Sequence, residues 1–295
     1  MIPEETLDII DPKALIGKKL VVVLGPTDVG KSTFIKRVYN ALCKNYKVFI
    51  LDTDVGQSDI GPPCTISLGT GEKPVDDLQE LKILSLHFLG STTPSYDTGD
   101  FIWGVTRVFE FSKTFNPDIT IVNTTGWVDG DKAFSTKISK ISLFRPDLII
   151  LVGSNMADYF RLFSSSLFDT IWVKPSVLSV IKDQETRRKN RLEKVIRFFS
   201  GKREEKLKLR NFVIYGDPGD ISPRKDTGEV PMEAFLRDME WRIIGFFGPG
   251  IRTIGIGWIQ RVNITTGEMV VKTFFVRDEK PRFVKLGPKF VPMGI

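Results

Sequence analysis

The sequence predicts an α/β protein, in which a three-layer domain with a mostly parallel central sheet is followed by a small β-rich C-terminal module. Three observations lead to this prediction. Up to Phe199, short apolar runs alternate with helical patterns, as in sheets that are covered by helices on both faces. A glycine-rich pattern, G-x-x-x-x-G-K-[ST], joins the first apolar run to the first helical pattern. After Phe199 the chain changes to short strand patterns and turns.

The elements of the three-layer domain follow from hydrophobic periodicity. Four apolar runs are typical of parallel strands buried on both faces: Leu20–Leu24, Val48–Leu51, Ile119–Val122 and Leu148–Val152. Helical patterns lie around Lys31–Lys44, Phe101–Phe115 and Lys132–Phe144, and further strand candidates are Leu81–Leu89 and Thr170–Val173. With right-handed crossovers, ligands bind beyond the carboxyl ends of such strands.

The glycine-rich pattern predicts a P-loop NTPase domain, because it follows a strand and opens a helix. Backbone N–H groups of the loop and the helix N-terminus surround a phosphate chain. Lys31 is expected to reach the β- and γ-phosphates, and the Ser32 hydroxyl to ligate Mg²⁺. The predicted nucleotide-binding residues are Gly25, Thr27, Asp28, Val29, Gly30, Lys31, Ser32 and Thr33. The sequence therefore predicts binding of a nucleoside triphosphate, with ATP and Mg²⁺ as cofactors.

The composition indicates a soluble globular protein and argues against membrane, secreted and zinc-binding proteins. The chain has 295 residues, of which 41% are hydrophobic and 26% charged, as in a soluble globular protein. No apolar stretch is long enough to cross a bilayer, and the acidic N-terminus does not resemble a secretory signal. The only cysteines, Cys43 and Cys64, suggest a reducing compartment, and the single histidine, His87, excludes a Cys/His zinc cluster. A cytoplasmic protein without a membrane partner is expected.

We expect three regions along the chain. Residues 1–200 form the P-loop domain, including a helix that carries a pair of arginines. Residues 201–230, rich in Lys, Arg, Gly, Asp and Pro, are expected to be a linker or mobile segment. Residues 231–295 form the β-rich module, with strands Arg252–Gln260 and Met269–Val276 on either side of a turn at 266–267.

Acidic residues follow the second strand, next to the P-loop. Asp52 and Asp54 precede Gln57, which could orient a water or a phosphate oxygen. One carboxylate can hold a metal-bound water while the other accepts a proton from an attacking hydroxyl. Many P-loop ATPases carry an aspartate at the end of the third buried strand, but here the residue is Asn123. We therefore predict a metal site of Ser32, Asp52 and Asp54, the alternative for the aspartates being a polar turn.

The loop after the third buried strand and a later basic helix complete the predicted site. Gly126 is placed like the glycine that senses a γ-phosphate in switch proteins, and Trp127 either stacks on a nucleobase or packs under the loop. Over Asp183–Phe199, an apolar stripe consists of Leu192, Val195, Ile196 and Phe199. Arg187 and Arg191 share another face with Lys194, an arrangement that suits a phosphotransferase lid, although most basic faces are simply solvated.

The combination of motifs resembles the polynucleotide 5′-hydroxyl kinases related to the Clp subunit of the mRNA cleavage and polyadenylation machinery. This group also contains ribosomal-RNA-processing kinases and short archaeal RNA/DNA kinases. The resemblance covers roughly Lys18 to Arg197 in family order. It rests on the P-loop, the Arg187/Arg191 pair and the segments Asp54–Gln57, Gly61–Pro63, Phe88–Pro94 and Asn123–Trp127.

The resemblance implies ATP-dependent transfer of the γ-phosphoryl group to the 5′-OH end of RNA or DNA, in RNA processing or repair. It implies that Asp54 is the general base and that Lys31, Arg187 and Arg191 act with it in catalysis. It also implies a substrate site of Gln57, Thr92, Thr93, Thr125, Gly126 and Trp127, in which Trp127 stacks on the terminal base. RNA-processing proteins are possible partners.

Two other functions stay open. A partition-type ATPase switch also has an acidic motif after its second strand, but its extra lysine early in the P-loop is replaced by Pro26 and Thr27. A non-catalytic ATP-binding scaffold of an RNA-processing complex would not need the residues of catalysis. Lys31, Ser32, Asp54 and both lid arginines are present, which favours the enzyme.

Overall fold

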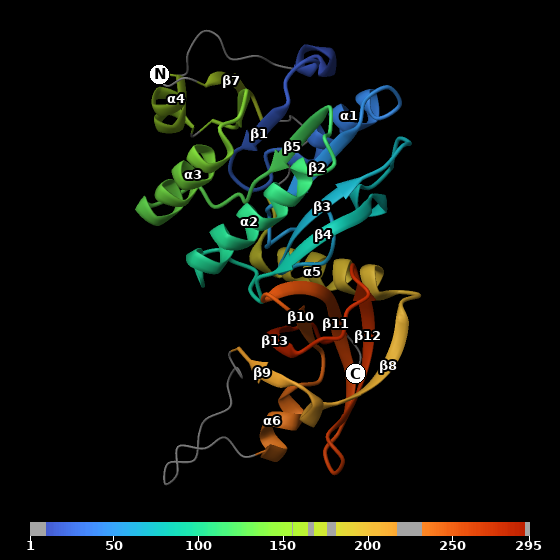
Figure 1. The fold of residues 1–295 in the computed structure, drawn as a ribbon. Helices are drawn as coiled ribbons and strands as arrows, with labels where there is room; N and C mark the ends of the chain where they lie inside the picture. Colours follow the sequence, from blue (N-terminus) through green and yellow to red (C-terminus); the bar gives the residue numbers. More distant parts are fainter. Residues whose placement is uncertain (1–9, 155, 165–167, 176–180, 217–231, 293–295) are drawn as a thin grey trace.

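The computed structural model describes residues 10–154, 156–164, 168–175, 181–216 and 232–292. It contains a seven-stranded sheet and a six-stranded sheet, which lie one above the other with α5 (Gln184–Phe199) between them (Figure 1). The acidic N-terminal residues 1–9 and the part of the predicted linker from 217 to 230 lie outside the described residues. No helix in the described ranges is long and apolar enough to span a membrane.

The seven-stranded sheet confirms the predicted α/β fold class. Its strands are β1 (Leu20–Leu24), β2 (Val48–Asp52), β3 (Thr65–Thr70), β4 (Lys82–Phe88), β5 (Ile119–Asn123), β6 (Leu148–Val152) and β7 (Asp169–Val173). The order is β4-β3-β2-β5-β1-β6-β7, so the strand that leads into the P-loop is flanked by two parallel neighbours. Only β3 runs against the direction of the other strands in this sheet. The sheet is therefore mixed but mostly parallel.

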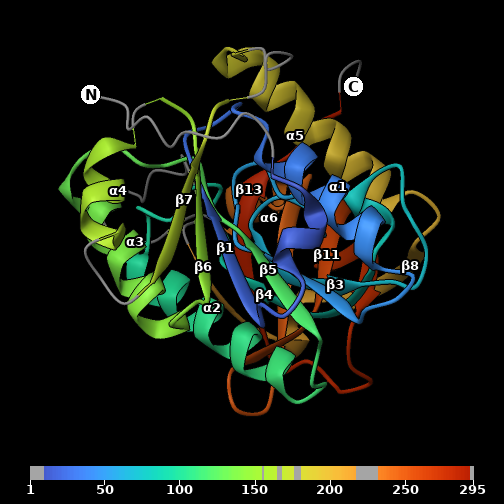
Figure 2. The same cartoon turned by 90° about the horizontal axis from the view of Figure 1, so that it is seen from above.

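Helices cover both faces of this sheet. They are α1 (Lys31–Leu42), α2 (Thr98–Lys113), α3 (Asp131–Phe144) and α4 (Ala157–Ser164). Seen from above, α1 lies on one face, and α2 and α3 lie on the other (Figure 2). Short 3₁₀ helices occur at η1 (Pro12–Leu15), η2 (Leu78–Glu80) and η3 (Leu209–Asn211).

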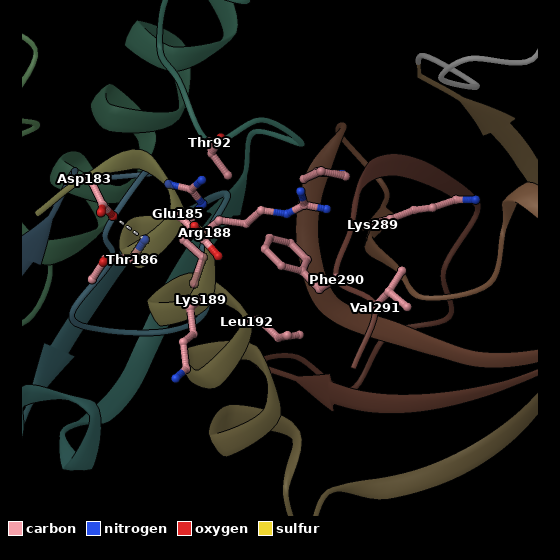
Figure 3. A pocket seen from close by; sticks show the side chains of 12 residues that line it. Thr92, Asp183, Glu185, Thr186, Arg188, Lys189, Leu192, Lys289, Phe290 and Val291 are labelled. Carbon is pink, nitrogen blue, oxygen red and sulfur yellow. Dashed lines mark hydrogen bonds between the residues drawn. The ribbon is translucent and has the colours of Figure 1, made fainter. Parts of the chain in front are cut away.

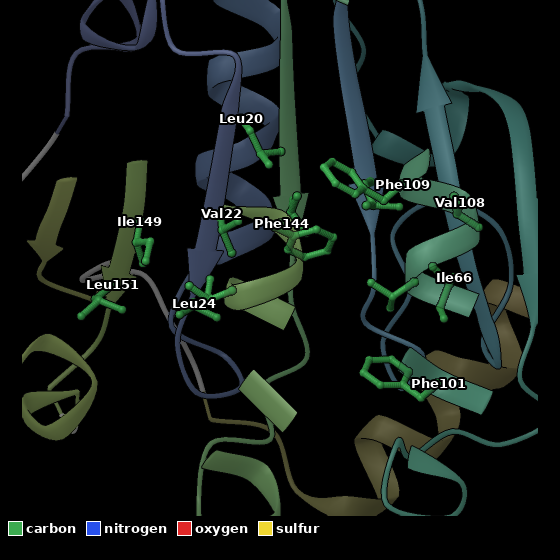
Figure 4. Packing of buried hydrophobic residues seen from close by; sticks show 14 of the residues in the cluster. Leu20, Val22, Leu24, Ile66, Phe101, Val108, Phe109, Phe144, Ile149 and Leu151 are labelled. Carbon is green, nitrogen blue, oxygen red and sulfur yellow. The ribbon is translucent and has the colours of Figure 1, made fainter. Parts of the chain in front are cut away.

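Side chains of β1 contribute alternately to the two hydrophobic cores of the three-layer domain, one on each face of the sheet. Leu20, Val22 and Leu24 pack with residues of α2 and α3, whereas Val21 and Val23 pack with residues of α1 (Figure 4 shows the first set). Successive side chains of a strand point to opposite faces, so all five residues of this strand are buried. A continuous apolar run is the pattern that such a strand requires.

The C-terminal sheet is larger than the sequence predicted. Its strands are β8 (Arg203–Lys208), β9 (Val213–Tyr215), β10 (Arg242–Gly248), β11 (Arg252–Asn263), β12 (Glu268–Phe275) and β13 (Phe283–Lys289), and α6 (Met232–Asp238) precedes β10. The strand order is β8-β12-β11-β10-β13-β9. Both β8 and β9 fall in the segment predicted to be a linker, so that prediction is wrong for residues 203–215. Both are edge strands, where charged residues are common, and their composition therefore looked like that of a linker.

The two sheets interlock at Phe88, the last residue of β4. Its ring is fully buried against two glycines of the C-terminal sheet, Gly245 and Gly287. A Cβ at Gly287 would lie 2.8 Å from Cζ of Phe88, and a Cβ at Gly245 would collide with the same ring. Val195 and Phe199 of α5 belong to the same buried cluster. The second sheet is thus joined to the first by complementary packing of side chains as well as by the polypeptide chain.

Candidate active site

The P-loop between β1 and α1 has the backbone of a phosphate cradle. Gly30 has φ of 93° and Asp28 has φ of 62°, both in the left-handed region. A Cβ at Gly25 would collide with the carbonyl group of Val152 at the end of β6. Val29 packs on the same place, 3.2 Å from that Cβ position. Glycine at 25 and 30 therefore lets the loop lie close against the sheet before the helix begins.

Lys31 and Ser32 open α1 at the centre of the site. Lys31 is only 6% exposed, and its Nζ donates a hydrogen bond to the carbonyl oxygen of Pro26 at 2.5 Å. Burial lowers the pKa of Lys31, and the carboxylates around it oppose that shift. The Ser32 hydroxyl donates to Oδ2 of Asp59, a residue that the sequence analysis did not single out. Thr33, on the next position of the helix, is exposed.

The loop after β2 holds Asp54 in a tight turn. Its Oδ1 accepts hydrogen bonds from the backbone N–H groups of Gly56 and Gln57, both at 3.1 Å. Its other carboxylate oxygen is not used by these bonds. The Nε2 of Gln57 is buried and has no hydrogen-bond partner among the described residues. Because buried amides are normally satisfied, this orphaned donor indicates space for a polar ligand beside Asp54.

Of the predicted substrate-binding residues Thr92 and Thr93, Thr92 lies next to this turn. A Cβ at Gly56 would come within 2.9 Å of the carbonyl oxygen of Thr92, so the two loops are in contact. Thr92 is half-buried, whereas Thr93 is exposed and its hydroxyl lies 2.8 Å from that of Ser95. Thr92 therefore borders the Asp54 turn, whereas no contact with that turn is seen for Thr93 among the described residues.

Asp52 has a different environment from the one predicted for a metal ligand. It is fully buried, and its two oxygens accept hydrogen bonds from Asp54 N, Ser58 Oγ, Asp59 N, Ile60 N and Asn123 Nδ2. Burial, with the nearby Asp59 and Asp54, raises the pKa of Asp52 to about 7. A carboxylate with five donors and no exposed surface orders the loop, and it would have to lose some of these bonds to ligate a cation.

Asp59 instead occupies the place beside the P-loop serine. Its Oδ1 accepts from Nζ of Lys194 at 3.0 Å, and its Oδ2 lies 3.3 Å from Nδ2 of Asn123. Hydroxyl and carboxylate oxygens are the ligands that Mg²⁺ prefers, so Ser32 and Asp59 fit such an ion. No group of three or more His, Cys, Asp or Glu side chains suited to a metal occurs in the part of the chain that the structure describes. Water and phosphate oxygens would complete the coordination of Mg²⁺.

The basic face of α5 contacts the P-loop and the segment that follows β2. The Nη2 of Arg187 lies 3.0 Å from Oδ2 of Asp28 and 3.3 Å from Oγ1 of Thr27. One turn on, Arg191 lies beside Cys64, and burial lowers the pKa of its guanidinium. Arg187 is thus held at the rim of the P-loop, and Arg191 lies near the segment that follows β2.

Lys194 extends this face towards the Asp54 turn. Its Nζ donates to the carbonyl oxygens of Gln57 at 3.0 Å and Ser58 at 2.6 Å, in addition to Asp59. On the opposite side of the helix, Val195 and Phe199 are buried, while Ile196 is 42% exposed. The predicted stripe is therefore buried at two of its four positions, and Ile196 lies outside the core.

The loop after β5 packs on the P-loop through Gly126, where a Cβ would collide with Thr27. Trp127 is half-buried. Thr125 is only 5% exposed, and its carbonyl and hydroxyl oxygens accept from Nζ of Lys137 at 2.5 and 3.1 Å. This differs from the substrate contact predicted for Thr125, because both of its oxygens are occupied by a buried lysine of α3.

A second buried lysine of α3 lies under the neighbouring loop. The Nζ of Lys140 donates to Oγ1 of Thr53 at 3.1 Å and lies 5.2 Å from the ring centroid of Phe101. Burial lowers the pKa of Lys140 to about 7 and also lowers that of Lys137. The two amines therefore support the loops that carry Asp54 and Trp127 from beneath.

Residues 25–201 match the family described as mRNA cleavage and polyadenylation factor CLP1 P-loop. The chain belongs to this family. The match begins at the first glycine of the P-loop and includes the whole of α5, so every site element described above lies inside it.

Relatives of this CLP1-family chain include archaeal proteins named polyribonucleotide 5′-hydroxyl-kinase. That of Pyrococcus furiosus is 35% identical over 225 residues, which are 76% of this chain and 62% of the relative. That of Pyrococcus horikoshii is 30% identical over 260 residues, covering 87% of this chain and 69% of the relative. The chain thus spans about 62% of the length of the Pyrococcus furiosus protein.

The fold also matches a solved structure of the wild-type Clp1p–Pcf11p complex. The TM-score is 0.71 at 12% identity, with 91% of this chain and 74% of the other covered. At this identity the likeness concerns the fold alone. Within the CLP1-family domain, sequence reasoning missed Asp59, Lys137 and Lys140. The spacing of Asp59 from Gln57 and the two lysines on an otherwise apolar face of α3 were the available signals.

Proposed function

We propose that this protein is an ATP-dependent polynucleotide 5′-hydroxyl kinase, which transfers the γ-phosphoryl group of ATP to the 5′-OH end of RNA or DNA. The observation that carries the proposal is the convergence of three groups on one P-loop. These are Lys31 within the loop, Asp54 in the turn beside it, and the lid arginine Arg187 on Thr27 and Asp28. The names of the archaeal relatives support the choice of substrate.

The proposed reaction uses each of these groups at a stated atom. The Asp54 carboxylate oxygen that accepts neither backbone N–H accepts the proton of the 5′-OH. At the same time the 5′-hydroxyl oxygen of the substrate bonds to the γ-phosphorus. The bond from that phosphorus to the bridging oxygen of the β-phosphate breaks, and ADP leaves. Lys31, Arg187 and Arg191 stabilise the charge on the transferring group. Ser32 and Asp59 would hold Mg²⁺, which when bound neutralises phosphate charge.

The substrate end is proposed to lie over the loop after β5. The buried Nε2 of Gln57, which has no hydrogen-bond partner in the described part of the chain, suits a phosphate or hydroxyl oxygen. Trp127, half-buried in the adjacent loop, would stack on the terminal base. Because the fold is that of a protein solved with Pcf11p, we also propose that RNA-processing proteins are partners of this chain.

The test is transfer of label from γ-labelled ATP to oligonucleotides. We expect 5′-OH RNA or DNA to be end-labelled and the same sequences with a 5′-phosphate to remain unlabelled. Lys31→Ala should abolish the signal, because it removes the cation at the β- and γ-phosphates. ATP hydrolysis without label transfer to any oligonucleotide would favour a partition-type ATPase switch. ATP binding without hydrolysis or transfer would favour a scaffold.

A further inference from the structure

A groove runs along the lid helix α5. One of its walls is the exposed side of α5, with Arg188, Lys189 and Leu192, and the other is the segment Pro288–Val291 at the end of β13. Thr92 closes one end of this groove (Figure 3). The cavity measures about 540 Å³, which is within the range of ligand-binding sites. We call it the lid groove.

The lid groove connects to the proposed reaction centre. Thr92 borders the Asp54 turn through Gly56, and it also lines a second cavity of about 420 Å³ on the other side of Pro288 and Lys289. Arg191, a lid arginine, lies in the wall of the groove as well. Through Thr92, the groove therefore lies next to the turn that holds Asp54.

The groove is lined by both charged and apolar side chains. Four cations line it, namely Arg188, Lys189, Arg191 and Lys289, against the carboxylates Asp183 and Glu185. Asp183 is already used as the cap of α5, where it accepts from the N–H of Thr186 at 2.7 Å. The apolar lining consists of Leu192 from α5, and Phe290 and Val291 from the segment after β13. Cations beside apolar side chains match the phosphates and bases of a single strand.

Two of these cations are available for a ligand. Lys289 is paired with Asp238 at 2.7 Å, and Arg191 belongs to the lid. Arg188 and Lys189 are exposed, and within the described ranges the side chain of neither makes a hydrogen bond or an ion pair. Figure 3 shows Arg188 reaching from α5 across the groove towards the Phe290 segment. Its position suits a phosphate that follows the first nucleotides.

We propose that the lid groove binds the single strand of the substrate downstream of its 5′ end, with Arg188 and Lys189 on the phosphates and the 290–291 segment against the bases. This rests on the proposed kinase function. It also gives the C-terminal sheet a role in holding substrate, since β13 supplies one wall. An acidic protein segment is a poorer fit, because the groove reaches Thr92, next to the turn where the 5′ end is expected.

The experiment uses Arg188→Ala/Lys189→Ala, with Lys206→Ala/Lys208→Ala as the matched control. The control removes two exposed charges from β8, at the edge of the C-terminal sheet. Binding of a 3′-labelled 12-nucleotide single strand is measured by fluorescence anisotropy at several salt concentrations, without ATP. The groove variant should bind at least about fivefold more weakly. The slope of log K against log salt should fall by ~1.4, because each phosphate that is no longer neutralised accounts for ~0.7. The control should match the wild type.

Kinetics separate this proposal from the proposed function. The groove variant should raise the KM for the 12-nucleotide substrate by about the same factor as the Kd, with kcat unchanged and the KM for a dinucleotide within about twofold of wild type. Equal binding by the two double variants, or an equal loss for dinucleotide and 12-nucleotide substrates, would overturn the groove. Absence of phosphoryl transfer to any oligonucleotide would overturn the kinase function, and the anisotropy result would still decide whether the groove binds a strand.

Discussion

Replacing Asp54 with asparagine separates the chemical role of this residue from its structural one. The two backbone N–H groups that donate to Oδ1, at 3.1 Å each, can donate equally well to an asparagine amide oxygen. The turn should therefore keep both hydrogen bonds, each worth about 0.5–1.5 kcal/mol. What Asp54→Asn removes is the second carboxylate oxygen, the proposed proton acceptor. Loss of a general base costs about two to four decades in rate, or roughly 3–5 kcal/mol of barrier.

The assay is single-turnover label transfer with enzyme in excess, so that product release does not hide the chemical step. We expect Asp54→Asn to reduce this rate by about a hundredfold to ten-thousandfold, with ATP affinity and Tm close to wild type. The comparison variant is Asp52→Asn. Because it disrupts a fully buried acceptor with five donors, it should lower the free energy of unfolding by about 1–3 kcal/mol. A rate for Asp54→Asn within about fivefold of wild type would refute the proposed role of Asp54.

Three further predictions concern the lid, the loop after β5 and the lysines beneath it. Arg187→Ala and Arg191→Ala should each lower kcat by about tenfold to a thousandfold, more than they raise the KM for ATP, and lysine at either position should rescue only partly. Trp127→Ala should raise the KM for oligonucleotide about tenfold or more; a large fall in Tm with unchanged KM would instead indicate core packing. Burial holds the pKa of Lys140 at about 7, below the ordinary value of 10.5. Between these values the unfolded chain binds a proton that the folded protein lacks, so stability should rise with pH by up to ~1.4 kcal/mol per unit relative to Lys140→Met. Urea unfolding of both proteins at pH 7 and 9 measures this, and a constant difference would contradict it.

The sequence predicted best those elements whose local residue pattern is compatible with only one type of secondary structure. The strands Leu20–Leu24 and Leu148–Val152 were predicted to the residue, because strands buried on both faces need continuous apolar runs. By contrast β3, with the sequence Thr-Ile-Ser-Leu-Gly-Thr, was missed. Most of its residues are small or polar. It pairs with β2 and β4 and packs against α2, and the pattern of residues within the strand does not indicate these contacts.

For the site as well, local features could be predicted from the sequence and long-range contacts could not. The P-loop and the basic face of α5 were predicted from spacing alone, because a loop and a helix face are local features; the roles of Arg187 and Arg191 stay predictions. The link between Lys194 and Asp59 joins residues 135 positions apart, and the burial of Asp52 depends on the segment that folds back over β2. Such placements arise from tertiary packing, so residue type next to the P-loop was too coarse a guide to separate Asp52 from Asp59.

The interlock at Phe88 bears on how this protein can be shortened. A fragment that ends at residue 201, where the family match stops, would keep the P-loop and the lid helix but lose Gly245 and Gly287. Leu86, Phe88, Val195 and Phe199, all buried in the whole protein, would then face water together along β4 and α5. Contiguous apolar surface of this kind promotes aggregation. A fragment of this kind is thus expected to aggregate by itself.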